Sequence, residues 1–186
     1  ITAGDDAFFV SASTISGGIV NTGTITGGTN AFNIVNATAP ITITNSGLID
    51  GNVILDGGIL RLNGLTGRVT GAVTGGAGST VTVNGTFTTE NTFSVDNFAI
   101  GTGGRLNIGH GVTAASGVSN AGTLAVASGV NATVTGNYTQ VAGGNFEISA
   151  STPDNFGTLT VTGTADLSAS GLVTVNLPDL LTAGTV

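Results

Sequence analysis

The 186-residue chain has no cysteine, three Lys or Arg residues, ten Asp or Glu residues and a net charge of −7. These numbers exclude a disulfide framework and a thiolate metal site. They also exclude the dense basic patch that binding to nucleic acid or to an anionic membrane requires. Hydrophobic residues make up 40% of the chain and charged residues only 7%, whereas disordered segments combine low hydrophobicity with high charge. The composition therefore predicts a folded chain whose surface is polar through Thr, Ser and Asn.

Short β-strands are expected along the whole chain, because apolar residues alternate with Thr or Asn at the period of a strand with one wet face. In chain order the expected strands are 41–44, 53–55, 59–62, 80–83, 106–108, 123–126, 133–135, 158–162 and 172–177. Gly-Gly, Asn-Gly, Ser-Gly and Asp-Gly pairs separate them, as expected of turns. No segment has the apolar spacing of an amphipathic helix, and no apolar run approaches the roughly 20 residues of a transmembrane helix. We therefore expect an all-β chain without a transmembrane segment.

One short unit recurs along the chain. Residues 21–27 begin Asn-Thr-Gly-Thr-Ile, residues 45–51 begin Asn-Ser-Gly-Leu-Ile at an offset of 24 residues, and residues 120–126 begin Asn-Ala-Gly-Thr-Leu. A period of roughly 20 to 50 residues is typical of repeat architectures. We interpret the unit as a corner, in which Asn and Gly form a tight turn and the Ile or Leu two residues later fills the core.

Two all-β architectures are compatible with short, regularly spaced strands, an antiparallel sandwich and a parallel β-helix. Three features favour the β-helix. The repeated unit returns at the length of a coil, and the scarcity of charged and aromatic residues suits ladders of like side chains about 4.8 Å apart. Glycines also fall at strand junctions, where tight corners favour positive φ. We therefore predict a right-handed parallel β-helix, a solenoid of about eight or nine coils forming a rod about 40 Å long.

The C-terminal third has a different pattern. From residue 133 the expected strands lengthen, and the aromatic residues Tyr138, Phe146 and Phe156 appear. A solenoid needs an atypical terminal unit, because its last coil otherwise exposes core residues and an unpaired strand edge. We therefore predict a β-helical repeat region over 1–132 and a C-terminal capping segment over 133–186, continuous with each other in one structural domain.

Residues in this third resemble the C-terminal passenger region of bacterial autotransporters, the proteins of type V secretion. The segments that carry the resemblance are 134–140, 143–148, 157–167 and 171–177. They are similar to the pertactin-like β-helix and its autochaperone segment, and the Asn-x-Gly units upstream resemble the β-helical coils of the same proteins. The resemblance covers nearly the whole chain and is most specific over 134–177.

The resemblance implies a non-enzymatic passenger that is exported and then held outside the cell by a C-terminal β-barrel, which this chain does not contain. Its expected location is the bacterial cell surface or the extracellular space, and its expected role is adhesion or contact with a host. The expected partners are that barrel, a host surface protein or glycan, or further copies of the chain. An autochaperone role would fall on residues 133–177. An alternative is a structural subunit of an extracellular filament or matrix, which the low charge and the unblocked strand edges of a solenoid favour.

A polysaccharide-acting enzyme is the third alternative, because some β-helices are lyases or hydrolases. Gly109-His110-Gly111 matches a Gly-His-Gly element of polygalacturonases, but the only Asp-Asp pair, Asp5-Asp6, lies far away in the sequence. A tripeptide in a chain with 32 glycines carries little information. We therefore interpret His110 as a turn residue.

The remaining sites that the sequence suggests are also weak. Asp50 and Asp56 flank one expected coil and could approach each other, as glycosidase carboxylates do at roughly 5 to 9.5 Å, but both precede glycines, where Asp is an ordinary turn residue. The stretches 57–60 and 75–80 fail the calcium-binding Gly-Gly-x-Gly-x-Asp pattern. With one histidine and no cysteine, zinc is not expected. We predict no catalytic residue, no cofactor site and no metal site.

Overall fold

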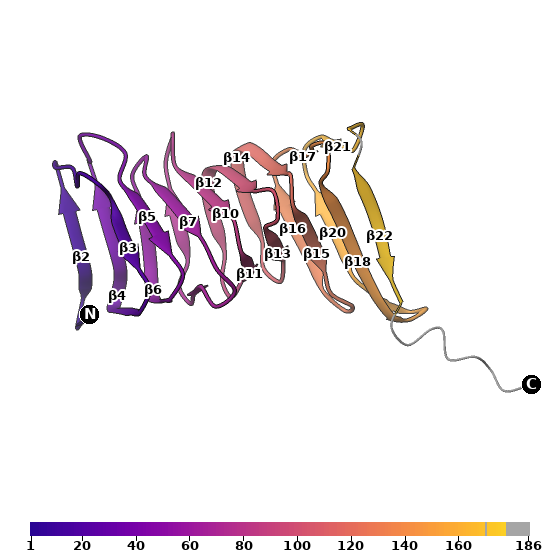
Figure 1. Cartoon of the computed structure of the whole chain (residues 1–186), viewed down its shortest axis with the longest axis horizontal. Coiled ribbons are helices and arrows are strands. Elements are labelled where there is room, and N and C mark those ends of the chain that lie inside the picture. The colour runs from indigo at the N-terminus through magenta and orange to yellow at the C-terminus, as the bar shows by residue number, and fades with distance from the viewer. Residues whose placement is uncertain (170, 178–186) are drawn as a thin grey trace, which may run out of the picture.

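The computed structural model describes residues 1–169 and 171–177, and in these residues it contains 22 β-strands and no helix. The strands form a stack of parallel coils that runs from the N-terminal to the C-terminal end of the molecule (Figure 1). The predicted all-β parallel solenoid is therefore confirmed. It has about seven turns, fewer than the eight or nine that we estimated, because some coils are longer than the roughly 20 to 24 residues assumed, with 27 residues between the paired Val134 and Val161.

Each coil contributes strands to three faces, which we number in chain order starting from β2. Face 1 contains β2 (Asp6–Ser11), the end of β4 (Thr24–Val35), the end of β6 (Leu48–Leu55), β9 (Val73–Gly75), the start of β12 (Phe93–Ile100), the start of β14 (Val112–Asn120), β16 (Asn131–Thr135) and β20 (Thr158–Val161).

Face 2 follows after a turn. It contains β3 (Ile19–Asn21), β5 (Thr42–Asn45), β7 (Ile59–Leu62), β10 (Thr80–Val83), the ends of β12 and β14, β17 (Tyr138–Gln140) and β21 (Ala165–Asp166). Face 3 contains β1 (Thr2–Ala3), the starts of β4 and β6, β8 (Arg68–Val69), β11 (Thr86–Thr88), β13 (Arg105–Asn107), β15 (Thr123–Val126), β18 (Asn145–Thr152) and β22 (Leu172–Asn176).

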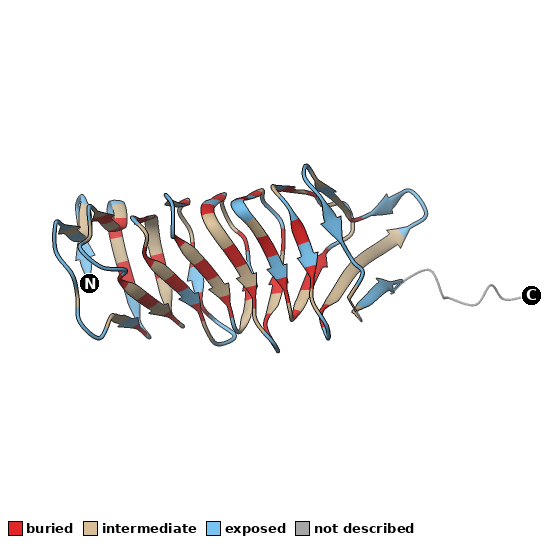
Figure 2. Cartoon of the chain, turned by 90° about the horizontal axis from the view of Figure 1, so that it is seen from above, coloured by how far each residue is buried: buried red, intermediate tan, exposed pale blue. Residues whose placement is uncertain are grey.

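The core consists of side chains stacked in columns. Every second residue of a strand points inward, and the register places it on its counterpart in the next coil. On face 2 one column runs through Ile43, Leu60, Val81, Phe98 and Val118, all of them buried. Figure 2 shows the resulting alternation of buried and exposed positions along the strands. The alternation read from the sequence is therefore that of strands with one face against a central core.

The recurring Asn-x-Gly units lie at the corner between faces 2 and 3. Asn21, Asn45 and Asn120 are all buried, with at most 5% of each exposed. The Nδ2 atom of Asn45 donates to the carbonyl oxygens of Gly47 at 3.0 Å and Arg68 at 3.2 Å, while its Oδ1 accepts from Asn21 Nδ2 at 2.8 Å. Ile49, two residues after Gly47, is fully buried. The unit is therefore the corner that the sequence predicted.

The glycine of this unit has a different purpose from the one we expected. Eleven described glycines have positive φ, but Gly23, Gly47 and Gly122 are not among them. A Cβ atom on Gly47 would instead clash with the carbonyl oxygen of Gly23 in the preceding coil, and one on Gly122 with that of Gly104. At Gly47 and Gly122, therefore, glycine is required because the preceding coil approaches closely.

The coils continue across residue 133 without a change of architecture. Val112 pairs with Val134, and Leu124 with Phe146, in the same parallel register as before. The first departure comes later, where β18 and β19 (Asn155–Phe156) form the only antiparallel pair among the strands described. All five residues of β22 are exposed. No described residue therefore covers the apolar positions of the last described coil. The division into 1–132 and 133–186 stays a prediction, and 178–186 lie outside the described residues.

Candidate functional site

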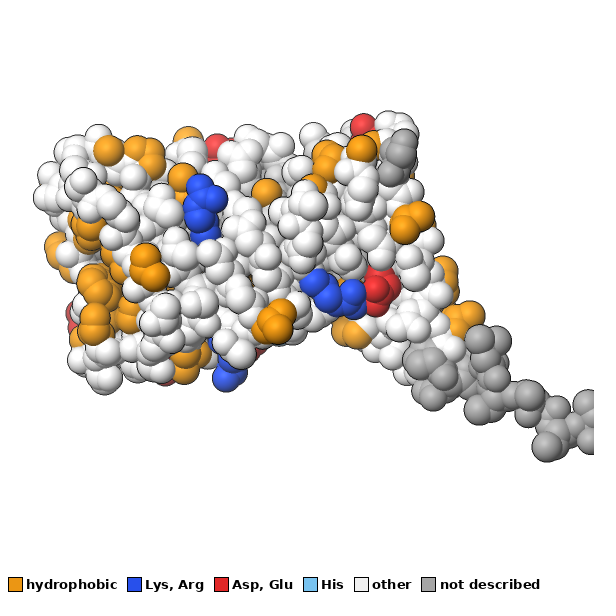
Figure 3. All heavy atoms as spheres, in the orientation of Figure 1, with side chains coloured by type: hydrophobic (Ala, Val, Ile, Leu, Met, Phe, Trp, Pro, Cys, Tyr) orange, Lys and Arg blue, Asp and Glu red, His pale blue; other side chains and the backbone are white. Residues whose placement is uncertain are grey.

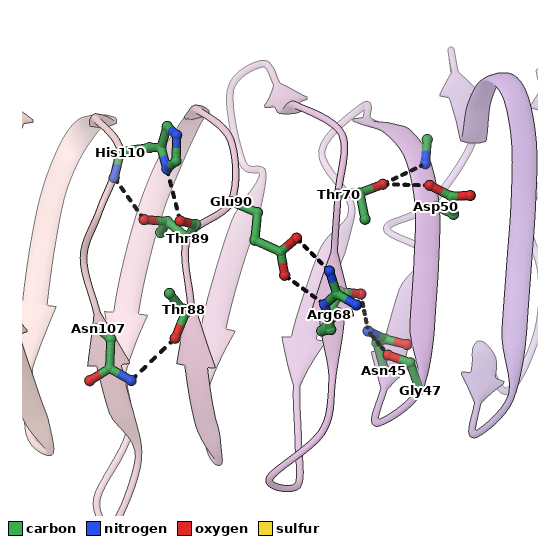
Figure 4. A network of polar contacts seen from close by, with 11 residues as sticks. Asn45, Gly47, Asp50, Arg68, Thr70, Thr88, Thr89, Glu90, Asn107 and His110 are labelled. Atoms are coloured by element: carbon green, nitrogen blue, oxygen red, sulfur yellow. Dashed lines mark hydrogen bonds and ion pairs between the residues drawn. The ribbon is translucent and has the colours of Figure 1, made fainter.

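His110 is bonded to the preceding coil at Thr89. Its Nδ1 atom lies 2.8 Å from the carbonyl oxygen of Thr89, and its backbone N–H donates to Thr89 Oγ1 at 2.9 Å (Figure 4). Both contacts join one coil to the next. The arrangement is that of a turn histidine that is held by the neighbouring coil.

The two carboxylates that could have formed a pair are separated by a corner. Asp50 lies on face 3, where its Oδ1 accepts a hydrogen bond from Thr70 Oγ1 at 2.7 Å (Figure 4). Asp56 follows β6 beyond face 1, past the corner at Gly51. The Asp6 carboxylate is also hydrogen-bonded within the fold. Its two oxygens accept hydrogen bonds from the side-chain amides of Asn30 and Asn33 at 2.8 and 2.7 Å. No group of three or more His, Cys, Asp or Glu residues that could hold a metal ion exists among the described residues.

Two ion pairs join coils on the surface. Arg68 donates two hydrogen bonds to Glu90, at 2.7 and 2.8 Å, and Arg105 donates two to Glu147, at 2.9 and 2.7 Å. In each pair the guanidinium lowers the pKa of the carboxylate below its usual range, first through the hydrogen bonds. Figure 3 shows how sparse charged side chains are on one side of the molecule. The pairs therefore connect coils and do not form a charged binding patch.

One groove stands out among the hollows of the surface. It has a volume of about 460 Å³ and is lined by residues at equivalent positions of four successive coils, from the end of face 1 into the following turn. Each coil contributes a short set, 34–36, 54–56, 74–76 and residue 94. The groove is open to solvent and not enclosed, and its volume lies within the range of roughly 300 to 1,000 Å³ of ligand sites.

Four polar side chains around the groove are free to meet a ligand, unlike the aspartates that join neighbouring coils. Asp6, Asp50 and Asp96 are each bonded to a side chain one coil away. In contrast, the exposed side chains of Asn36, Asp56, Thr74 and Ser94 make no hydrogen bond to any other described residue. Four polar groups without a hydrogen-bond partner among the described residues therefore lie around this hollow.

The sequence suggests Asp56 only as a catalytic partner of Asp50, and it contains no signal for Asn36, Thr74 or Ser94. The signal that identifies the groove is the position of Gly75 opposite Leu55, and this becomes visible only once the register of the coils is known.

No described helix is long and apolar enough to cross a membrane. Comparison with known proteins gives no relative for this chain: no protein-family model matches the sequence, and no curated protein and no solved structure matches it either. The fold and the geometry of the groove are therefore the basis for the function proposed below.

Proposed function

We propose that this chain is a β-helical rod of a secreted or cell-surface protein, which makes contacts through its faces and catalyses no reaction. More specifically, we propose that it is a passenger fragment of a bacterial autotransporter, displayed outside the cell by a β-barrel and used in adhesion. The observation that carries the proposal is the solenoid of parallel coils without cysteine. Such a rod presents extended side faces, as repeat proteins do when they bind large partners.

Two features of the surface support a contact role. Among the described residues, Thr is the commonest side chain at exposed positions, and only 7% of the whole chain is charged, so the faces offer hydrogen bonds without strong electrostatic repulsion. His110 and the candidate carboxylates Asp6 and Asp50 are held in contacts between coils. Binding without catalysis is the role that fits this arrangement.

A chimeric protein tests the proposal. We would place an export signal before the chain and an autotransporter barrel after it, and measure protease access and adhesion on intact cells. The expected result is a chain that protease removes from the cell surface, on cells that attach to a host-cell layer more than cells with the barrel alone. Failure to reach the surface contradicts the passenger assignment, whereas display without added attachment contradicts the adhesive role.

A filament or matrix subunit is the second candidate, and one observation favours it. Leu172, Val173 and Val175 of β22 are between 57% and 68% exposed, at the unpaired side of the last described coil. An open strand edge with apolar side chains is a template for pairing with another chain. Electron microscopy of the purified chain at high concentration should show filaments in this case, and single short rods would exclude it.

A further inference from the structure

We propose that the groove beside face 1 binds a short stretch of an uncharged or amino-bearing oligosaccharide. The groove is formed by residues 34–36, 54–56, 74–76 and residue 94, and we call it the face 1 groove. The proposal rests on the contact role proposed above and assigns it a site and a class of ligand.

Glycine creates the hollow. The register pairs Leu55 with Gly75, and the following residues are Asp56 and Gly76. A side chain on Gly75 would meet Ser79 and the Leu55 backbone, so this glycine is required by packing. A Cβ on Gly76 would meet nothing within 4 Å, and its φ is not positive. Gly76 therefore leaves space that a larger side chain could fill without disturbing the coil.

The lining suits a sugar chain. Asn36, Asp56, Thr74 and Ser94 supply an amide, a carboxylate and two hydroxyls, all exposed and without partners among the described residues. Ile54 is half-buried and adds an aliphatic patch. Small-molecule sites typically combine apolar surface with a few polar groups that fix orientation. Four coils about 4.8 Å apart extend the groove over about 14 Å, which favours an elongated ligand over a compact one.

The charge of the groove lining limits the class of ligand further. None of the three Arg residues lines the groove, whereas the Asp56 carboxylate does. The whole chain carries a net charge of −7. An acidic polysaccharide would be repelled by this carboxylate, while a neutral sugar could donate its hydroxyl protons to it and an amino sugar could form an ion pair.

A peptide is a poorer occupant. Peptides that bind sheets commonly add a strand at a free edge, but the strands beneath the groove are already paired from coil to coil, Ile34 with Leu55 and Leu55 with Gly75. No strand edge is available there. Recognition must therefore go through side chains, which is how hydroxyl-rich ligands are held.

The experiment uses the purified chain and defined tetrasaccharides. Maltotetraose, cellotetraose, mannotetraose and the chitosan tetramer represent the proposed class, and tetragalacturonate is the anionic control. Binding is measured by calorimetry and by NMR of the ligand for the wild type, Gly76→Leu, Asp56→Asn and Gly23→Leu. Gly23 is the matched control, because a Cβ there also meets nothing within 4 Å and its φ is not positive.

The expected result is that at least one neutral or amino-bearing tetrasaccharide binds the wild type and Gly23→Leu equally. Gly76→Leu should weaken that binding at least tenfold, and Asp56→Asn should weaken it severalfold, with the unfolding midpoint of each variant close to that of the wild type. The proposal is overturned if no neutral or amino-bearing tetrasaccharide binds, if Gly76→Leu binds as well as the wild type, or if tetragalacturonate binds best. Attachment of displayed cells that persists in Gly76→Leu would leave the contact role standing and place it elsewhere on the rod.

Discussion

At the scale of single residues, the Asn-x-Gly unit makes a turn in which the asparagine and the glycine serve different purposes. Its recurrence predicted a turn, and the buried Asn45 with its contacts to two backbone carbonyls confirms it. The reason for its glycine could not be predicted, because the atom that excludes a Cβ at Gly47 belongs to Gly23, 24 residues earlier. A local sequence pattern does not reveal which carbonyl lies against it from the neighbouring coil.

Gly47→Ala and Gly23→Ala should therefore differ, although both occupy the same position of the repeated unit. A Cβ on Gly47 clashes with the preceding coil, whereas one on Gly23 meets nothing within 4 Å. We expect Gly47→Ala to lower the free energy of unfolding by about 1 to 3 kcal/mol, the usual cost of overpacking, and Gly23→Ala to change it by less than about 0.5 kcal/mol. Urea denaturation of the two variants checks this, and equal effects would contradict the close-approach explanation.

Asn45→Ala tests the other half of the unit. The substitution removes the donor to the Gly47 and Arg68 carbonyls in a fully buried position. A buried polar group left without a partner costs about 1 to 3 kcal/mol, so we expect a loss of that size in the free energy of unfolding. Asn84→Ala is the control, because Asn84 is exposed and bonded only to Asn63 at 3.0 Å. Thermal unfolding should show a clear loss for Asn45→Ala and little for Asn84→Ala.

At the scale of elements, short alternating strands were predictable and long ones were not. The expected strands 59–62, 80–83 and 123–126 match β7, β10 and β15. In contrast, β14 was missed, because its Thr-Ala-Ala-Ser-Gly stretch has no strong apolar alternation and the strand bends from face 1 to face 2 through Gly117, at φ 112°. Period-two patterns describe straight strands, so a strand that rounds a corner is not recognised by them.

Arg105 and Glu147 connect elements that are not neighbours. The register runs from Asn107 through Ala125 to Glu147, so the ion pair spans the intervening coil and lies over Ala125, which is only 5% exposed. The contact joins β13 to β18 across β15. The small side chain of Ala125 leaves room for the guanidinium above it. The ion pair therefore joins three successive coils.

This pair should make stability depend on pH. Arg105 lowers the pKa of Glu147 below its ordinary value of 4.5. The unfolded chain therefore takes up the proton first, and the stabilisation is complete above about pH 4.5 and is lost as the pH falls through the lower folded pKa. The Arg105 side chain is 37% exposed, so after allowance for solvent screening we expect about 0.5 to 1 kcal/mol.

Denaturation of the wild type and Glu147→Gln across this range measures the effect. The difference between them should be present at pH 7 and shrink below pH 4.5. Glu90→Gln is the comparison, since its partner Arg68 is 58% exposed, and it should change stability less. A difference for Glu147→Gln that does not vary with pH would contradict an electrostatic origin.

At the scale of the whole molecule, the architecture could be predicted, whereas the face 1 groove could not. The repeat and the composition indicated stacked coils, and stacking is what the register shows. The groove depends on coil lengths, because the offset is 17 residues between Ile43 and Leu60 but 27 between Val134 and Val161. Because the coils differ in length, their lengths decide which side chains lie opposite one another in successive coils. No local sequence pattern reveals this alignment.

The last described coil leads to a prediction about how whole molecules associate with one another. Val173 stacks on Phe146 in an inward column, yet 57% of it is exposed, because no described strand lies beyond β22. If this edge joins copies end to end, a lysine there should prevent it, since a charge in an inward position of an edge strand opposes pairing. The contact would be heterologous and would not close, so association should grow continuously with concentration.

Sedimentation velocity over a wide concentration range tests this with Val173→Lys and with Thr113→Lys as a control. Thr113 is exposed on face 1, within β14 and away from that edge, and its substitution adds the same charge. We expect the wild type and Thr113→Lys to form larger species as concentration rises and Val173→Lys to remain monomeric. A wild type that stays monomeric at every concentration would remove end-to-end assembly and leave the rod to act as a single unit through its side faces.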